Sequence, residues 1–164
     1  MSLLQPEMLE LLLRLLVAVV LGASLGVERS LAGKTAGMRT YALVSLGAAM
    51  FVAISQAVTS QYMQIGMRNF DPLRVASQIV VGIGFLGAGL IIFKSHKLRG
   101  LTTAAGLWVA AGIGMASGYG LYFLAIGGAL FTLLIFTVLW QLEQVLERHV
   151  LPEEPKERKT RAKK

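Results

Sequence analysis

Three glycines, Gly82, Gly84 and Gly87, have the Gly-x-Gly-x-x-Gly spacing of loops that bind the diphosphate of a dinucleotide. Such a loop follows a strand, opens a helix and has an acidic residue roughly 20 positions further on. Here residues 79–93 are continuously apolar, and the next acidic residue is Glu143. The sequence therefore predicts no nucleotide site and no cofactor. It predicts instead an apolar helix that has no side chain at these glycines.

Two carboxylates, Glu28 and Asp71, lie at the edges of apolar stretches and are the weak candidates for metal ligands. Magnesium prefers oxygen ligands, commonly carboxylates. The topology argued below places these two acids on opposite sides of a membrane, so one subunit cannot bring them together. The sequence has no cysteine, and it shows no Ser/His/Asp set or paired carboxylates of the kind that supports catalysis. We expect a protein that is not an enzyme.

The composition indicates a membrane protein, because 55% of the residues are hydrophobic and only 15% are charged. A bilayer-spanning helix needs roughly 20 apolar residues. The sequence therefore predicts an all-α, polytopic bundle of about five spans, with a transmembrane domain at 1–142 and a charged tail at 143–164. The predicted spans are 8–27, 39–60, 72–93, 101–118 and 120–142.

The distribution of Lys and Arg predicts the orientation of these spans. The five spans place all but three of the sixteen basic residues on one side, the exceptions being Arg14, Arg68 and Arg74. Loops rich in Lys and Arg remain in the cytoplasm. We therefore expect the N-terminus outside and the C-terminus in the cytoplasm. Since the positive charge lies between apolar stretches and in the tail, we expect the lipid bilayer as a partner and no nucleic acid.

An internal similarity suggests a duplicated hairpin made of spans one and two and of spans three and four. The second helices begin with related segments, "GMRTYALVSLGAA" (37–49) and "GLTTAAGLWVAAG" (100–112). Two helix N-termini on the cytoplasmic side, with Arg29, Arg39 and Arg99 nearby, could bind an anion. The same residues could instead cap helices, contact lipid phosphates and set the topology.

Glycines recur in the predicted spans at spacings that allow close helix packing. Lipid supplies no hydrophobic drive between helices, so small residues at their contacts bring the backbones together. We expect a tightly packed bundle or a homo-oligomer, with a dimer favoured, and we expect Trp108 to be packed in the bundle. The predicted packing glycines are Gly22, Gly26, Gly82, Gly84, Gly87, Gly89, Gly114 and Gly118.

Polar residues open the third span. Asp71-Pro72 is typical of a helix start, since Asp accepts free backbone N–H groups and Pro suits the first helical position. Arg74 and Gln78 follow on the same face of the helix. We expect an Asp71–Arg74 ion pair, which serves either as a structural cap or as part of a polar entrance.

Three ordered motifs resemble the MgtC/SapB family of bacterial membrane proteins. They are "GVERSLAGKTAGMRTYALVSLGAAMF" (26–51), "DPLRVASQIVVGIGFLGAGLI" (71–91) and "RGLTTAAGLWVAAGIGMASGYG" (99–120). The resemblance implies an inner-membrane protein linked to low-magnesium adaptation and, in some pathogens, to survival inside macrophages. It also implies a membrane partner such as the ATP synthase. Longer members carry a soluble C-terminal domain, and functions of that domain are not expected of residues 1–164.

The resemblance and the residue pattern together leave two functions open. The first is a regulatory protein that acts through contacts within the membrane. The second is a small-ion or solute transporter or channel, for Mg²⁺ or an anion, whose polar path uses Asp71 and Gln78 on one side and Arg39 and Thr102 on the other. The polar positions that carry either function are Glu28, Arg29, Arg39, Thr40, Asp71, Arg74, Gln78, Arg99, Thr102 and Thr103.

Overall fold

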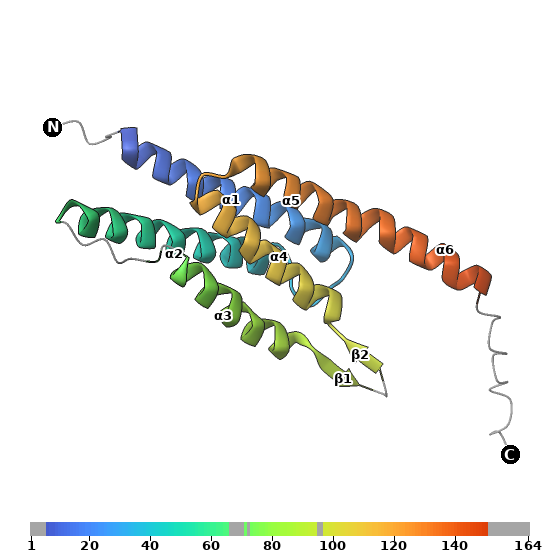
Figure 1. Ribbon diagram of the computed structural model, residues 1–164. Coiled ribbons are helices and arrows are strands. Elements are labelled where there is room, and N and C mark those ends of the chain that lie inside the picture. Colours follow the sequence, from blue (N-terminus) through green and yellow to red (C-terminus); the bar gives the residue numbers. More distant parts are fainter. Residues whose placement is uncertain (1–5, 66–70, 72, 95–96, 151–164) are drawn as a thin grey trace, which may run out of the picture. The chain divides into compact units, whose positions relative to one another are not determined.

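The computed structural model of the protein describes residues 6–65, 71, 73–94 and 97–150. The chain forms two compact units, residues 1–133 and residues 134–164. The described part of the first unit is a helix bundle whose successive helices run in opposite directions (Figure 1). Its helices are α1 (Pro6–Leu31), α2 (Met38–Gln64), α3 (Arg74–Leu90), α4 (Leu101–Gly118) and α5 (Tyr122–Leu134).

The predicted all-α membrane fold is confirmed. Four helical stretches are long and apolar enough to cross a membrane: Glu7–Leu31, Met38–Gln64, Leu101–Gly118 and Tyr122–Leu146. Helix α3 is apolar but has 17 residues, or about 25 Å at 1.5 Å per residue. That length is somewhat less than the roughly 30 Å hydrocarbon core of a bilayer.

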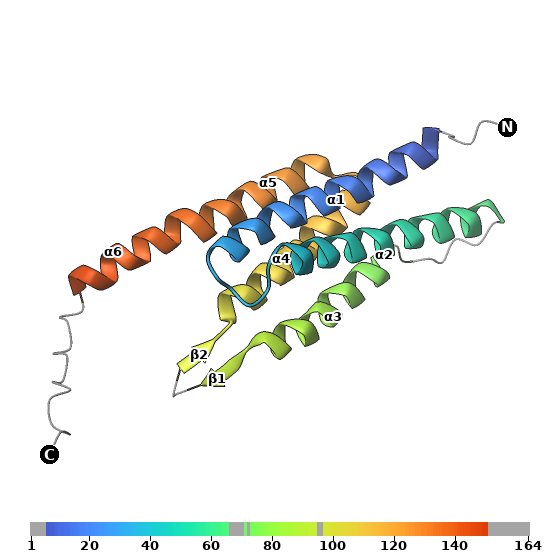
Figure 2. The same ribbon diagram turned by 180° about the vertical axis from the view of Figure 1, so that it is seen from behind.

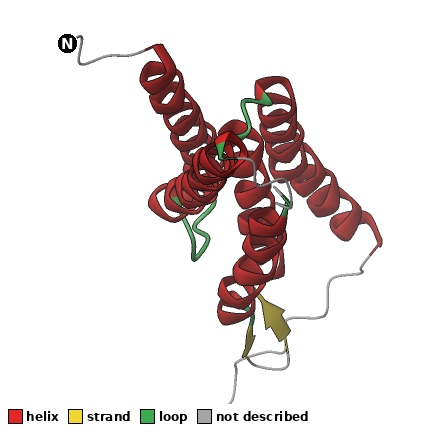
Figure 3. Cartoon of the chain, turned by 60° about the vertical axis from the view of Figure 1, so that its left-hand side comes forward, coloured by secondary structure: helices red, strands yellow, loops and turns green. Residues whose placement is uncertain are grey.

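The third span is shorter than predicted, because residues at its end leave the helix. Ile91 has an extended backbone (φ −84°, ψ 110°), and a two-stranded antiparallel hairpin of β1 (Ile92–Lys94) and β2 (Lys97–Arg99) follows (Figure 3). Gly100 then turns the chain into α4 with φ +91°, a conformation that suits glycine. A Cβ at Gly100 would also lie 2.1 Å from the Leu90 carbonyl oxygen.

A short turn joins α1 to α2. Gly33 has φ +64°, and the Ser30 hydroxyl accepts the Met38 N–H at 3.1 Å. Ser30 thereby satisfies one of the free N–H groups at the start of α2. A Cβ at Gly37 would lie 2.3 Å from that hydroxyl, so the glycine leaves room for the cap.

Helices α1, α2 and α4 approach one another at glycines. A Cβ at Gly22 would lie 2.7 Å from the Tyr41 carbonyl oxygen, and one at Gly26 would lie 2.4 Å from Met38 Cα. On the other side of α2, a Cβ at Gly114 would lie 2.1 Å from the Ser45 carbonyl oxygen. Gly118 makes a similar approach to Ala49, and both views of the bundle show α2 beside α1 and α4 (Figures 1 and 2).

Helix α3 does not use its glycines in this way. A Cβ added at Gly82, Gly84 or Gly89 would meet no atom within 4 Å, and one at Gly87 would lie 3.6 Å from Ala104 Cβ. The prediction of close packing at the first three is therefore wrong for contacts within this chain. Those positions lack a neighbouring helix at close range.

The second unit continues from α5 as a π-helical turn, η1 (Ile135–Leu139), and then as α6 (Trp140–Val150). The predicted boundary after residue 142 falls inside α6, so the described chain has no break in the helix there. Residues 151–164 of the predicted tail lie outside the described residues.

Candidate functional site

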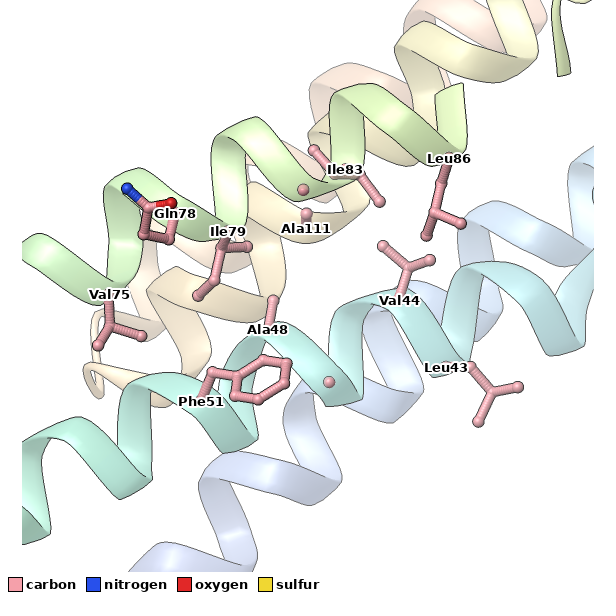
Figure 4. A pocket seen from close by; sticks show the side chains of 12 residues that line it. Leu43, Val44, Ala48, Phe51, Val75, Gln78, Ile79, Ile83, Leu86 and Ala111 are labelled. Atoms are coloured by element: carbon pink, nitrogen blue, oxygen red, sulfur yellow. The ribbon is translucent and has the colours of Figure 1, made fainter. Parts of the chain in front are cut away.

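An apolar groove of about 520 Å³ lies between α2, α3 and α4 (Figure 4). Its floor is a cluster of Ala48, Ile83 and Ala111, one residue from each helix. Of the side chains that line it, only that of Gln78 is polar. The lining residues are Leu43, Val44, Gly47, Ala48, Phe51, Val75, Gln78, Ile79, Gly82, Ile83, Leu86 and Ala111.

Two glycines keep the groove open. Gly47 on α2 and Gly82 on α3 both line it, and a Cβ at either position would meet nothing within 4 Å. Helix α3 makes far more of its contacts with α4 than with α2. The groove therefore lies where α2 and α3 are separated, at two positions that have no side chain.

Helix α3 has an exposed apolar face that does not line the groove. Val81 is 69% exposed and Phe85 is 80% exposed, and Gly84 between them has open space above it. Helical spacing places these residues and Ala88, which is also exposed, on one surface. This outer face of α3 combines large and small residues in the manner of helix contacts in membranes.

The polar start of α3 differs from the prediction in one contact. Asp71 Oδ1 accepts the Leu73 N–H at 2.9 Å, and the Asp71 carbonyl oxygen accepts the Arg74 N–H at 3.2 Å. The expected ion pair between the Asp71 and Arg74 side chains is not formed within 4 Å, although both residues are described and exposed. The Asp71 carboxylate is engaged by backbone, which holds it beside the helix start. Gln78 lines the groove about one turn further on.

At the end of the bundle where α1 meets α2, polar groups gather in the interior. Arg29 is only 2% exposed, and its Nε donates to the Glu28 carboxylate. Tyr41, fully buried, donates its hydroxyl to the Thr103 carbonyl oxygen at 3.3 Å. Arg29 and Glu28 both act electrostatically on Tyr41, so this cluster links α1, α2 and α4. Tyr41 had no signal in the sequence beyond its place in a motif.

The other predicted polar residues at this end do not join that cluster. Arg39, Thr40, Arg99 and Thr102 are exposed. The buried guanidinium of Arg29 is neutralised by Glu28, so the expected anion pocket would rest on Arg39 and Arg99. Glu28 lies in the last turn of α1, whereas Asp71 lies just before the start of α3. No three His, Cys, Asp or Glu residues of the described chain form a group that could hold a metal ion.

Arg14 forms a second polar cluster at the far end of α1. Its guanidinium donates to Gln56 Oε1 at 3.0 Å and to the Gly118 carbonyl oxygen at 3.1 Å, and it pairs with Glu10. The Gly118 carbonyl ends α4 and has no partner within its helix, so a cation there is favourable. These contacts could not be expected from the sequence, because the partners of Arg14 are 42 and 104 residues away.

Next to this cluster is an open pocket of about 470 Å³ with hydroxyl and amide groups in its wall. It is an open depression at the end of α2. Its lining residues are Gln56, Thr59, Ser60, Met63, Gln64 and Tyr119.

Trp108 does not lie in the interior. It is 53% exposed on α4, so the prediction that it packs inside the bundle is wrong for this chain. In lipid an indole ring is as well accommodated on the outer surface as between helices, and hydropathy does not distinguish the two.

Comparison with known proteins identifies the family to which these helices belong. A model of the MgtC family matches residues 15–145, which include all of α2, α3, α4 and α5. The chain belongs to the MgtC family. The three motifs that carried the resemblance lie within the matched range, and they include Arg29, the start of α3 and the residues that line the groove.

Curated relatives of this MgtC-family protein cover most of its chain. The Escherichia coli K12 protein named "Putative magnesium transporter YhiD" is 41% identical over 133 residues, which are 81% of this chain and 62% of the relative. The Brucella abortus (strain 2308) protein named "Protein MgtC" is 43% identical over 130 residues, 79% of this chain and 51% of the relative. The chain therefore spans about half to three fifths of the length of the curated relatives it matches.

No solved structure matches this MgtC-family protein. Family membership and the four long apolar helices together make it a membrane protein.

Proposed function

We propose that this MgtC-family protein is a regulatory protein of the bacterial inner membrane that acts by binding another protein within the bilayer. The observation that supports this most is the outer face of α3, where Val81 and Phe85 are 69% and 80% exposed around an open Gly84. Helices associate in lipid through close van der Waals packing at small residues. A partner helix can approach closely at Gly84 and pack against the protruding ring of Phe85.

Two partners fit this surface. One is a second copy of the chain in a homo-oligomer, with a dimer favoured. The other is a different membrane protein such as the ATP synthase, which the family resemblance implies. Regulation of this kind fits the link to low-magnesium adaptation that the same resemblance implies, and it needs no metal site in the protein. The proposed orientation has the N-terminus outside and the C-terminus in the cytoplasm, as the Lys and Arg distribution predicts.

Transport is the second candidate, and one polar residue favours it. Gln78 on α3 is among the residues that line the groove, and the name of the Escherichia coli relative refers to magnesium transport. A path would run from Asp71 and Gln78 toward the exposed Arg39 and Thr102 at the other end. The wall between these ends is apolar, and an ion would lose hydration there without replacement ligands.

Cross-linking in native membranes tests the regulatory function. A photoreactive phenylalanine analogue at position 85 should give a discrete protein adduct, identified by mass spectrometry as the same chain or as a partner such as an ATP synthase subunit. The matched control is position 123, since Phe123 on α5 is 94% exposed. Lipid adducts alone at both positions would contradict the proposal.

Flux through the purified protein in liposomes decides the second candidate. Saturable movement of Mg²⁺, K⁺, H⁺ or phosphate that is lost in Gln78→Leu would establish transport in place of regulation. Its absence in folded protein, together with a position-85 adduct, would leave the regulatory function as the better description.

A further inference from the structure

The groove between α2 and α3 is long enough for a single hydrocarbon chain. Along α3 it extends from Val75 to Leu86, about 16 Å at 1.5 Å per residue. That is roughly half of the 30 Å hydrocarbon core, or one leaflet. Its volume of about 520 Å³ is ample for one acyl chain of that length.

The lining of the groove also favours a hydrocarbon occupant. Gln78 contributes its only polar side chain, and water is held in proteins where it finds several polar partners. Inside a bilayer the molecules adjacent to an open apolar groove are acyl chains. The length and the lining together favour a lipid tail over water.

Charged groups of both signs stand at one end of the groove. Arg74 immediately precedes the lining residue Val75, and Asp71 lies one turn before it. Both side chains are exposed, and no ion pair joins them within 4 Å. A guanidinium suits a phosphate, to which it can donate two hydrogen bonds. A carboxylate suits a primary ammonium group, which donates three.

From these features we infer that the groove binds one phospholipid, with an acyl chain between α2 and α3 and an ethanolamine headgroup at Arg74 and Asp71. The phosphate contacts Arg74 and the ammonium contacts Asp71. This site does not use Val81 or Phe85, so it does not depend on the proposed function. A lipid there fills the space that Gly47 and Gly82 leave and supports α3 against α2.

Native mass spectrometry of the full chain, titrated with three phospholipids that have identical acyl chains, tests this site. Phosphatidylethanolamine should bind once per chain. It should bind roughly fivefold more tightly than phosphatidylglycerol, which lacks the amine, or phosphatidylcholine, whose trimethylammonium has no N–H, since one charge contact near the membrane is worth about 1 kcal/mol. Tighter binding of phosphatidylglycerol, or equal binding of all three lipids, would overturn the headgroup assignment.

Two glycine variants on the same helix test the location. Gly82→Leu places a side chain in the groove, whereas Gly84→Leu places the same side chain on the outer face of α3. Neither Cβ meets an atom within 4 Å, so both variants should fold, as circular dichroism can verify. Gly82→Leu should abolish the bound lipid and Gly84→Leu should retain it. Equal lipid binding in the two variants would overturn the site, and Gly47→Leu repeats the test from α2.

Two charge variants test the headgroup contacts. Arg74→Gln should weaken binding of all three phospholipids by roughly fivefold. Asp71→Asn, which preserves an oxygen acceptor for the Leu73 N–H, should weaken only phosphatidylethanolamine. If a second copy of the chain occupied the groove instead, the unmodified protein would carry no lipid and Gly82→Leu would lose its dimer mass. That result would overturn the proposal. It would not affect the cross-link from position 85, which tests the proposed function.

Discussion

The two hairpins of the bundle, α1–α2 and α3–α4, have similar glycine-rich sequences but pack differently. In the first, Gly22 and Gly26 bring α1 so near α2 that an added Cβ would lie 2.7 and 2.4 Å from the nearest atoms of α2. In the second, Gly87 approaches Ala104 only at 3.6 Å, and Gly82 and Gly84 have open space. The two helices of the first hairpin thus pack tightly on each other, whereas α3 of the second hairpin leaves much of its surface exposed.

The difference shows that one residue type serves two purposes in this membrane protein. Where a second backbone is present, as at Ser45 opposite Gly114, glycine permits contact between helices. Where none is present, glycine shapes a groove or a hollow on the outside. The buried polar contacts follow the same division, because Arg14, Arg29 and Tyr41 join α1, α2 and α4, while the polar residues at the start of α3 are exposed.

The largest effect should come from Gly114→Ala. Its Cβ would lie 2.1 Å from the Ser45 carbonyl oxygen and 2.8 Å from Ser45 Cα, so α4 must move away from α2. We expect the free energy of unfolding to fall by about 3 kcal/mol, measured by titration with SDS in mixed micelles. The matched control is Gly112→Ala, two residues away, where a Cβ meets nothing within 4 Å. Equal stability of the two variants would mean that close approach to α2 does not hold α4.

A smaller loss should follow Arg14→Met, which keeps the length of the side chain but removes its hydrogen bonds to Gln56 and to the Gly118 carbonyl. Hydrogen bonds of charged groups contribute about 2 kcal/mol, and we expect a loss of that size in the same titration. Arg39→Met serves as the control, since Arg39 is exposed on α2. If Arg14→Met is as stable as that control, the Arg14 contacts do not stabilise the packing of α1, α2 and α4.

Much of the fold could be predicted from the sequence, because the length of an apolar stretch is sufficient to locate a membrane helix. The ends of α3 were harder to place. Ile92 and Phe93 are as apolar as the helix before them, yet they pair with Arg99 and Leu98 in a hairpin. Only the extended backbone at Ile91 and the positive φ of Gly100 distinguish that segment.

The candidate site was harder to predict. In lipid, the hydropathy of a residue does not show whether it faces another helix or the acyl chains. Gly84 and Gly114 each end a Gly-Ile-Gly triplet in an apolar stretch, but one is open and the other is packed against backbone. Trp108 was misplaced for the same reason. The contacts of Arg14 could not be predicted, because its partners come from α2 and α4 and the sequence pattern does not show which helices are neighbours.

Removal of a single buried hydroxyl should have a modest effect. Tyr41→Phe removes the 3.3 Å hydrogen bond to the Thr103 carbonyl oxygen that links α2 to α4, and we expect a loss of about 1 kcal/mol in the free energy of unfolding. Tyr122→Phe is the matched control, because the buried Tyr122 hydroxyl has no hydrogen-bond partner among the described residues. That variant should be unchanged or slightly more stable. A larger loss in Tyr122→Phe than in Tyr41→Phe would contradict this account.

The smallest effect on stability is expected of Gly84→Ala, which directly tests the exposed surface of α3. With no atom within 4 Å of the new Cβ, the methyl group meets no neighbour, and it lowers the conformational freedom of the unfolded chain. The purified monomer should therefore gain about 0.5 kcal/mol in stability, the opposite sign from Gly114→Ala. If the variant is instead less stable, and its oligomer mass falls, the outer face of α3 is covered by a second copy. The contrast between the hairpins would then hold for the single chain but not for the assembled protein.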